Sequence, residues 1–275
     1  MEIVVPDAFA REFLRALLTL REYMPNIVLI GGCVPYVYSK YMFDKPLKQA
    51  PVYTKDLDLL VENQVPLAEN SVVSLMQAAG YACRTLESRH TQCFKFESRA
   101  GTGFEIEFLT PAPDKEHGDT VVVQGGLRAQ VIPGLELFLS HNTGVRIVDE
   151  LDGTAVDITV RVPTPGAFVL NKLRTYLEPL GDRDRTKDLY YVFYVVRSLT
   201  IGKEAIVDGM RECASNQALE SLANELQTLF SDEYSDGTRD VAMQLTGLDL
   251  REHDKRLLVR LEMSELARLL MPSQS

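Results

Sequence analysis

Two aspartates, Asp56 and Asp58, stand one residue apart at the start of the apolar run DLDLLV, residues 56–61. Strand side chains alternate between the two faces of a sheet, so both carboxylates point to the same face. Neighbouring carboxylates repel each other, and burying them without a partner costs free energy. A bound cation removes both costs, so this pair predicts a metal site at the beginning of a strand.

A second acidic strand is FEIEF, residues 104–108, where Glu105 and Glu107 share one face and apolar side chains share the other. Alone, each acidic pair is more often the solvated side of a half-buried strand. Together with Asp56 and Asp58, these residues indicate carboxylates that converge from neighbouring strands. Magnesium prefers hard oxygen ligands and takes few of them from protein, and such an arrangement provides them.

Gly31 and Gly32 separate a strand-like apolar run, residues 26–30, from a segment of helical character that begins at Cys33. Glycine lets the backbone approach a phosphate closely, and the N-terminus of a helix favours negative charge. A Gly-Gly pair is most often only a turn, and its combination with Asp56 makes it a candidate phosphate loop. These features suit nucleotidyl transfer, in which divalent ions neutralise a triphosphate, activate the attacking oxygen and steady the leaving pyrophosphate.

Gly31-Gly32, Asp56-x-Asp58 and a later strand acid resemble the nucleotidyltransferase superfamily typified by DNA polymerase β. Many members have Gly-Ser at the first motif, so Gly32 leaves no hydroxyl there for a phosphate. The chain is also similar, over residues 27–196, to a bacterial branch, the toxin-type nucleotidyltransferases of abortive-infection systems. The segments that carry this second resemblance are IEFLTP (106–111), VPTPGAFVLNKL (162–173) and RDRTKDLYYVFYVV (183–196).

The resemblance implies a magnesium-dependent transferase that moves a nucleoside monophosphate from an NTP to a hydroxyl acceptor, with Mn2+ as the alternative ion. Its catalytic acids and metal ligands are then Asp56, Asp58 and Glu107, the acid directly before Phe-Leu-Thr-Pro. Glu105, which shares the face of Glu107, is the alternative third acid. The resemblance favours tRNA or another RNA end as the acceptor, and it leaves a protein or a small molecule open.

The resemblance also assigns nucleotide binding to residues of both halves of the chain: Gly31, Gly32, Lys172, Lys187 and Asp188. The glycine backbone amides are expected to hold the triphosphate, and Lys172 to offset charge on the leaving pyrophosphate. Helical spacing places Lys172 on one face with Phe168 and Tyr176. The alternatives are a surface lysine lying on apolar neighbours for Lys172, and a solvated helix start for Lys187-Asp188.

The chain changes character near Pro163-Thr164-Pro165. Short apolar runs and turns precede this point, while nearly everything after it, to residue 271, has helical periodicity. We therefore expect an α+β fold: a nucleotidyltransferase-type mixed β-sheet with flanking helices, plus a C-terminal helical domain. The expected domains are a catalytic domain, 1–162, and a helical domain, 163–275, which completes the nucleotide pocket. Helices are predicted at 7–23 and 70–81, and strands at 26–30, 55–62, 93–98 and 104–111.

The chain has 275 residues and a net charge of −10. Proteins whose whole surface coats nucleic acid are usually basic, so a contact with RNA must come from a local basic patch. The four cysteines and four histidines are scattered, which argues against a structural zinc site and a disulfide framework and favours a reducing compartment. Without a signal-peptide core or an apolar run of about 18 residues, a cytoplasmic protein without membrane contact is expected.

Two other functions are compatible with the same motifs. A nucleotide-binding or regulatory protein could keep the fold without catalysis, although a degenerate site would be expected to lose its carboxylates. The chain could instead be the toxin subunit of a toxin–antitoxin pair, silenced by a partner. Growth arrest on expression, relieved by Asp56→Ala, would identify a toxin. The sequence leaves the oligomeric state open.

Overall fold

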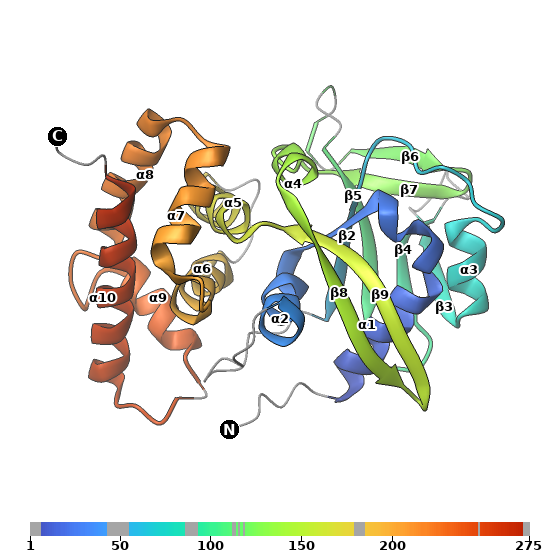
Figure 1. Ribbon diagram of the computed structural model, residues 1–275, viewed down its shortest axis with the longest axis horizontal. Helices are drawn as coiled ribbons and strands as arrows, with labels where there is room; N and C mark the ends of the chain where they lie inside the picture. The colour runs from blue at the N-terminus through green and yellow to red at the C-terminus, as the bar shows by residue number, and fades with distance from the viewer. Residues whose placement is uncertain are drawn as a thin grey trace. The chain divides into compact units, whose positions relative to one another are not determined.

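The computed structural model describes residues 7–42, 55–85, 93–111, 114, 116–117, 119–178, 185–246 and 248–271. The chain divides into two compact units between Pro163 and Thr164 (Figure 1). We call the described residues up to Pro163 the sheet unit, and those from Thr164 onward the helical unit. A mixed sheet with flanking helices, followed by a helical region, confirms the expected α+β class.

The sheet unit is built on nine strands in the described part of the chain. Their order is β3-β4-β7-β5-β2-β1-β9-β8, with β6 paired to β7 and β4 also paired directly to β5. The central pair β1 and β2 is antiparallel, whereas β2 and β5 are parallel. The strands are β1 (Ile27–Ile30), β2 (Asp56–Val61), β3 (Tyr81–Thr85), β4 (Cys93–Ser98), β5 (Glu105–Thr110), β6 (Thr120–Gln124), β7 (Leu127–Val131), β8 (Asn142–Leu151) and β9 (Thr154–Pro163).

Short helices accompany this sheet: α1 (Asp7–Thr19), η1 (Arg21–Asn26), η2 (Gly31–Cys33), α2 (Val34–Val37), η3 (Tyr38–Met42), α3 (Val72–Ala78) and α4 (Glu136–Ser140). The predicted helix 7–23 ends at Thr19 and continues as a 3-10 turn that contains Pro25. Helix α3 begins after Ser71, whose hydroxyl accepts a hydrogen bond from the Ser74 amide at 3.2 Å.

The helix predicted after the glycines is divided into α2 and the wider π-helical turn η3. Pro35 lies in the first turn of α2, where its missing N–H removes no helical hydrogen bond. In η3, Lys40 Nζ and the Tyr41 hydroxyl each lie 2.6 Å from Asp149 Oδ2 on β8. These contacts to β8 accompany the wide turn, and sequence periodicity alone does not reveal them.

Burial along β2 and β5 explains where their acids lie. Both strands have the same pattern: the first four residues alternate between partly exposed and buried, and the last two are buried. The partly exposed positions are those of the four acids, while Leu57 and Ile106 between them are fully buried. The beginning of each strand is therefore half solvated, and the remainder belongs to the core.

A disulfide joins Cys83 on β3 to Cys93 on β4, with the Cα atoms 5.5 Å apart. The scattered cysteine spacing did not indicate this bridge, because the two residues meet only through the antiparallel pairing of β3 with β4. One bridge in a hairpin is not the disulfide framework typical of small secreted domains. The thiol of Cys33 donates a hydrogen bond to the Ile30 carbonyl oxygen at 3.1 Å, and Cys213 is half-buried.

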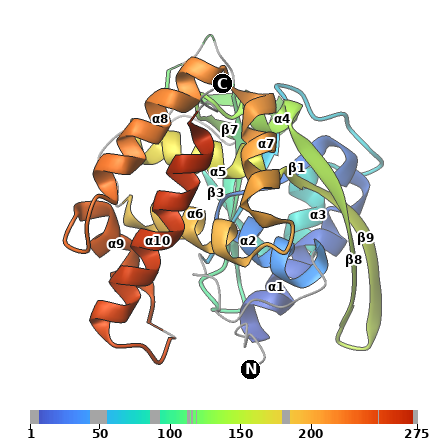
Figure 2. The same cartoon turned by 60° about the vertical axis from the view of Figure 1, so that its left-hand side comes forward.

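The helical unit contains α5 (Pro165–Leu177), α6 (Thr186–Ser198), α7 (Gly202–Cys213), α8 (Asn216–Leu229), α9 (Asp236–Gln244) and α10 (Glu252–Leu270). Thr164 begins α5, since its hydroxyl accepts a hydrogen bond from the Ala167 amide at 3.4 Å. Helix α10 packs along α8, as Figure 2 shows. Among the described residues, none of the helices has the length and apolar character needed to cross a membrane.

Candidate active site

The structure brings four acids together on one face of the sheet. Strands β2 and β5 are parallel neighbours, with Asp56 opposite Glu105 and Asp58 opposite Glu107. Residues opposite each other, and residues two apart on one strand, share a face. We call this set, Asp56, Asp58, Glu105 and Glu107, the acidic face. The sequence predicted that the two acids of each strand share a face, and the strand register shows that the two pairs lie opposite each other.

Gly31 is fixed next to the acidic face by two constraints. Its φ is +71°, in the left-handed region that favours glycine. It also follows Ile30, which lies opposite Asp58, and a Cβ at position 31 would overlap the Oδ2 atom of Asp58. The backbone of the predicted phosphate loop therefore touches the acid directly. Gly32 is buried in the 3-10 turn η2 that follows.

Lys95 on β4 is a residue of this site that sequence reasoning missed. Its Nζ lies 2.5 Å from Glu105 Oε2 and 2.5 Å from Glu107 Oε1. The three side chains are 20%, 28% and 27% exposed. Burial by itself lowers the pKa of the Lys95 ammonium, but the hydrogen bonds to Glu105 and Glu107 outweigh burial, and the pKa lies above its ordinary value. Lys95 is therefore charged at neutral pH.

A divalent cation fits the acidic face in donor type and in strand register. Carboxylate oxygens are the ligands that magnesium prefers, and Asp58 and Glu107 are direct cross-strand partners. In their described positions, however, no three Asp, Glu, His or Cys side chains are grouped as ligands of one ion, among the residues that the structure describes. One oxygen of Glu107 instead binds the Lys95 ammonium.

The other assigned residues lie in the helical unit. Lys172 on α5 binds Asp188 on α6, with 2.8 Å between Nζ and Oδ1, and their side chains are 13% and 7% exposed. The Lys172 ammonium also lies 5.4 Å from the ring centroid of Tyr191. Such low exposure excludes a surface lysine, and the sequence did not indicate that the two assigned residues pair with each other. Lys187 is exposed at the start of α6.

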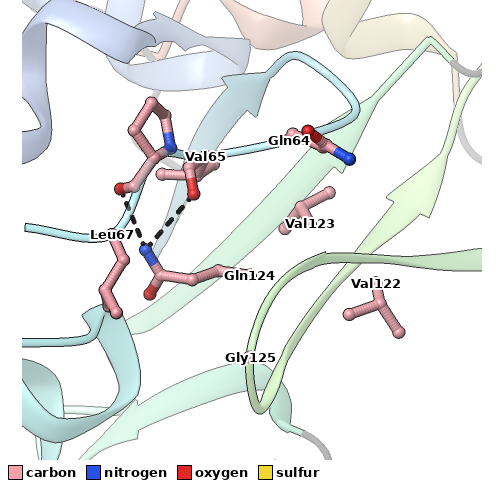
Figure 3. A pocket seen from close by; sticks show the side chains of 8 residues that line it. Gln64, Val65, Leu67, Val122, Val123, Gln124 and Gly125 are labelled. Atoms are coloured by element: carbon pink, nitrogen blue, oxygen red, sulfur yellow. Dashed lines mark hydrogen bonds between the residues drawn. The ribbon is translucent and has the colours of Figure 1, made fainter.

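A separate hollow lies beyond the far end of β2. Its lining includes Val65, Leu67 and Gln124, shown in Figure 3. The Gln124 amide donates hydrogen bonds to the carbonyl oxygens of Val65 (3.5 Å) and Pro66 (3.2 Å), so it ties this segment to β6. None of the lining residues is titratable or nucleophilic. This hollow therefore offers no group for catalysis.

Acids aligned on two parallel strands beside a glycine turn suit nucleotidyl transfer, because they could hold the divalent ions that neutralise a triphosphate, and a family comparison agrees. The Nucleotidyltransferase family model matches residues 10–202, so the chain belongs to this family and is a transferase. The matched range contains the acidic face and the Lys172–Asp188 pair. Membership of the toxin-type branch stays a prediction.

Two crystal structures from Helicobacter pylori are also similar to the chain. JHP933 is 13% identical, with a TM-score of 0.45, and the match covers 97% of this chain and 94% of that one. A candidate nucleotidyltransferase from H. pylori is 12% identical, with a TM-score of 0.42 and 97% coverage of both chains. No curated protein matches the chain.

Proposed function

We propose that this protein is a magnesium-dependent nucleotidyltransferase that moves a nucleoside monophosphate from an NTP to a hydroxyl, with an RNA end such as that of tRNA as the acceptor. One observation carries the proposal: the register that sets Asp58 opposite Glu107, next to the backbone of Gly31. Two constraints on that glycine, its φ and its contact with a carboxylate, suit a site where backbone approaches a phosphate.

In this proposal Asp56, Asp58 and Glu107 hold Mg2+, which Mn2+ can replace. The bound ion would neutralise phosphate charge and activate the acceptor hydroxyl. The backbone at Gly31 and Gly32 would bind the triphosphate beside this ion, because glycine at position 31 lets the backbone lie against the carboxylate of Asp58. The four acids share one half-solvated face, where a nucleotide from solution can reach them.

We propose that the helical unit contributes three nucleotide-binding residues: Lys172, Lys187 and Asp188. Asp188 accepts a hydrogen bond from Lys172 and so orients its ammonium. A cation held in this way can offset charge on the pyrophosphate without the entropy cost of ordering a free lysine side chain. Lys187 is exposed and contributes a second positive charge at the start of α6.

The RNA acceptor is the finer part of the proposal. It is supported by the resemblance to the toxin-type branch, while the net charge of −10 limits any RNA contact to a small patch. A protein hydroxyl or a small molecule would need no such patch. The test incubates the protein with each labelled NTP, magnesium and total cell extract. Label in RNA supports the proposal, whereas label found only in protein or in small solutes means that the acceptor is not RNA.

Asp58→Asn is the matched test of the chemistry, because it removes one charge from the acidic face and keeps the side-chain shape. We expect NTP-dependent pyrophosphate release to be lost while the urea unfolding midpoint stays close to that of the native chain. Arg146→Met on β8 is the control, since its partner Asp157 lies on the exposed hairpin. Undiminished release by Asp58→Asn would rule out the proposed mechanism.

A further inference from the structure

We propose that Lys95 is a resident counter-cation of the acidic face, which holds Glu107 in the metal-free protein and releases it to a divalent cation while remaining bound to Glu105. The inference rests on the proposed function and assigns different roles to the two acids of β5. Glu107 is then the ligand, and Glu105 is a positioning residue that anchors Lys95.

The first support is a row of charges that crosses four strands. Arg84 on β3 lies opposite Lys95 on β4, Lys95 lies opposite Glu107 on β5, and Glu107 lies opposite Asp58 on β2. Opposed residues share a face of the sheet. The backbone register therefore fixes Lys95 as the neighbour of Glu107, and the contact does not depend on one chance rotamer.

The second support is that Lys95 has no other acid on β4 to hold it. Glu97, which shares its face, lies opposite Glu105 but forms an ion pair with Arg84. The ammonium of Lys95 is thus directed to the two acids of β5, with equal distances of 2.5 Å. Its three N–H donors allow it to bind both carboxylates at once.

Because Lys95 binds both acids, releasing Glu107 costs little free energy. When a divalent cation takes over Glu107, Lys95 keeps one charged hydrogen bond with Glu105, so the ammonium is never left without a counter-charge. Before that, Lys95 separates two like charges that would repel each other. Release still removes one charged hydrogen bond, and the native protein must therefore bind cations more weakly than a chain without Lys95.

Calorimetric titration with MgCl2 alone tests this competition. Lys95→Met keeps the length of the side chain and removes the charge, and we expect it to bind Mg2+ roughly tenfold more tightly. Lys95→Arg retains a cation between the acids and should bind close to the native level. Arg146→Met also removes one positive charge from the sheet unit, but away from the acids, and should leave the affinity unchanged.

A double-variant cycle tests the role of Glu105. Glu105→Gln leaves Lys95 with Glu107 alone and should weaken Mg2+ binding, whereas in the Lys95→Met background the same change should have little effect. The inference is overturned if Lys95→Met binds Mg2+ no more tightly than the native chain, or if neither of these two proteins binds it. It is also overturned if Glu105→Gln weakens binding equally in the Lys95→Met background. If Asp58→Asn leaves the Mg2+ affinity intact, the proposed metal site itself fails. If Asp58→Asn abolishes binding but Lys95→Met changes nothing, only the role of Lys95 fails.

Discussion

Replacing Gly31 by alanine should lower the activity of the enzyme far more than the stability of the fold. Two costs arise at this position. Alanine at a φ of +71° costs about 1–2 kcal/mol, because its Cβ crowds the carbonyl oxygen in the left-handed region. In addition, the new methyl group overlaps the Oδ2 atom of Asp58, so the carboxylate must move away. The first cost affects stability, and the second displaces a proposed metal ligand.

The expected loss of activity is larger than the loss of stability suggests. A displacement of about 1 Å in a catalytic group costs about 100-fold in rate. We therefore expect kcat/KM for pyrophosphate release to fall by at least this factor. Urea unfolding should show a decrease of only about 1–2 kcal/mol in the free energy of unfolding.

Gly80→Ala is the matched control for this experiment. Gly80 has a φ of +91°, and a Cβ there would meet no atom within 4 Å. Its substitution thus carries the backbone cost alone, and we expect similar destabilisation with turnover unchanged. Equal turnover in the Gly31→Ala and Gly80→Ala variants would refute the argument that Gly31 makes room for Asp58.

Two further predictions concern charged pairs. Asp188→Leu leaves the Lys172 ammonium buried without this counter-charge and should destabilise the helical unit by about 3–5 kcal/mol. Adding Lys172→Met should restore most of this loss, and urea unfolding measures the stability of both variants. If the effects of the two substitutions simply add in the double variant, the two side chains do not stabilise each other. For Asp149, burial raises the pKa of the carboxyl, but the hydrogen bonds from Lys40, Tyr41 and the Glu150 amide, with the charge of Lys40, together outweigh burial and lower the pKa below its ordinary value. Its stabilising contribution is therefore present above about pH 4 and lost as the pH falls further. Asp149→Asn should have a lower free energy of unfolding than the native chain at pH 7, and the difference should shrink as the pH falls below about 4. A difference that stays constant with pH would contradict the lowered pKa of Asp149.

The acids could be predicted from sequence because their signal is local. Alternation over a few residues shows that Asp56 and Asp58 point to the same side of their strand, and that Glu105 and Glu107 do so on theirs. Lys95 gave no such signal, since CFKFES reads as an ordinary strand with one lysine. Its role depends on the register between β4 and β5, which is set by contacts distant in sequence.

The same reason accounts for what was missed in the helical unit. Helical spacing predicted that Lys172 shares a face with aromatic residues, and its ammonium does lie over Phe168. The pairing of Lys172 with Asp188 requires the packing of α5 against α6, which periodicity within one helix does not contain. Lys172 and Asp188 were each assigned singly, as predictions, and the structure shows that they pair with each other.

The alignment of the acids is itself enforced by apolar residues. A slip of β5 by one residue would turn Glu107 toward the core and bring Ile106 and Phe108 to the half-solvated face. Both are fully buried, and exposing each would cost about 1.5–3 kcal/mol, in addition to the cost of burying a carboxylate. Because Leu57 imposes the same constraint on β2, the core residues between the acids hold Asp58 opposite Glu107. A substitution such as Phe108→Ala would therefore weaken the site through register, without touching a carboxylate.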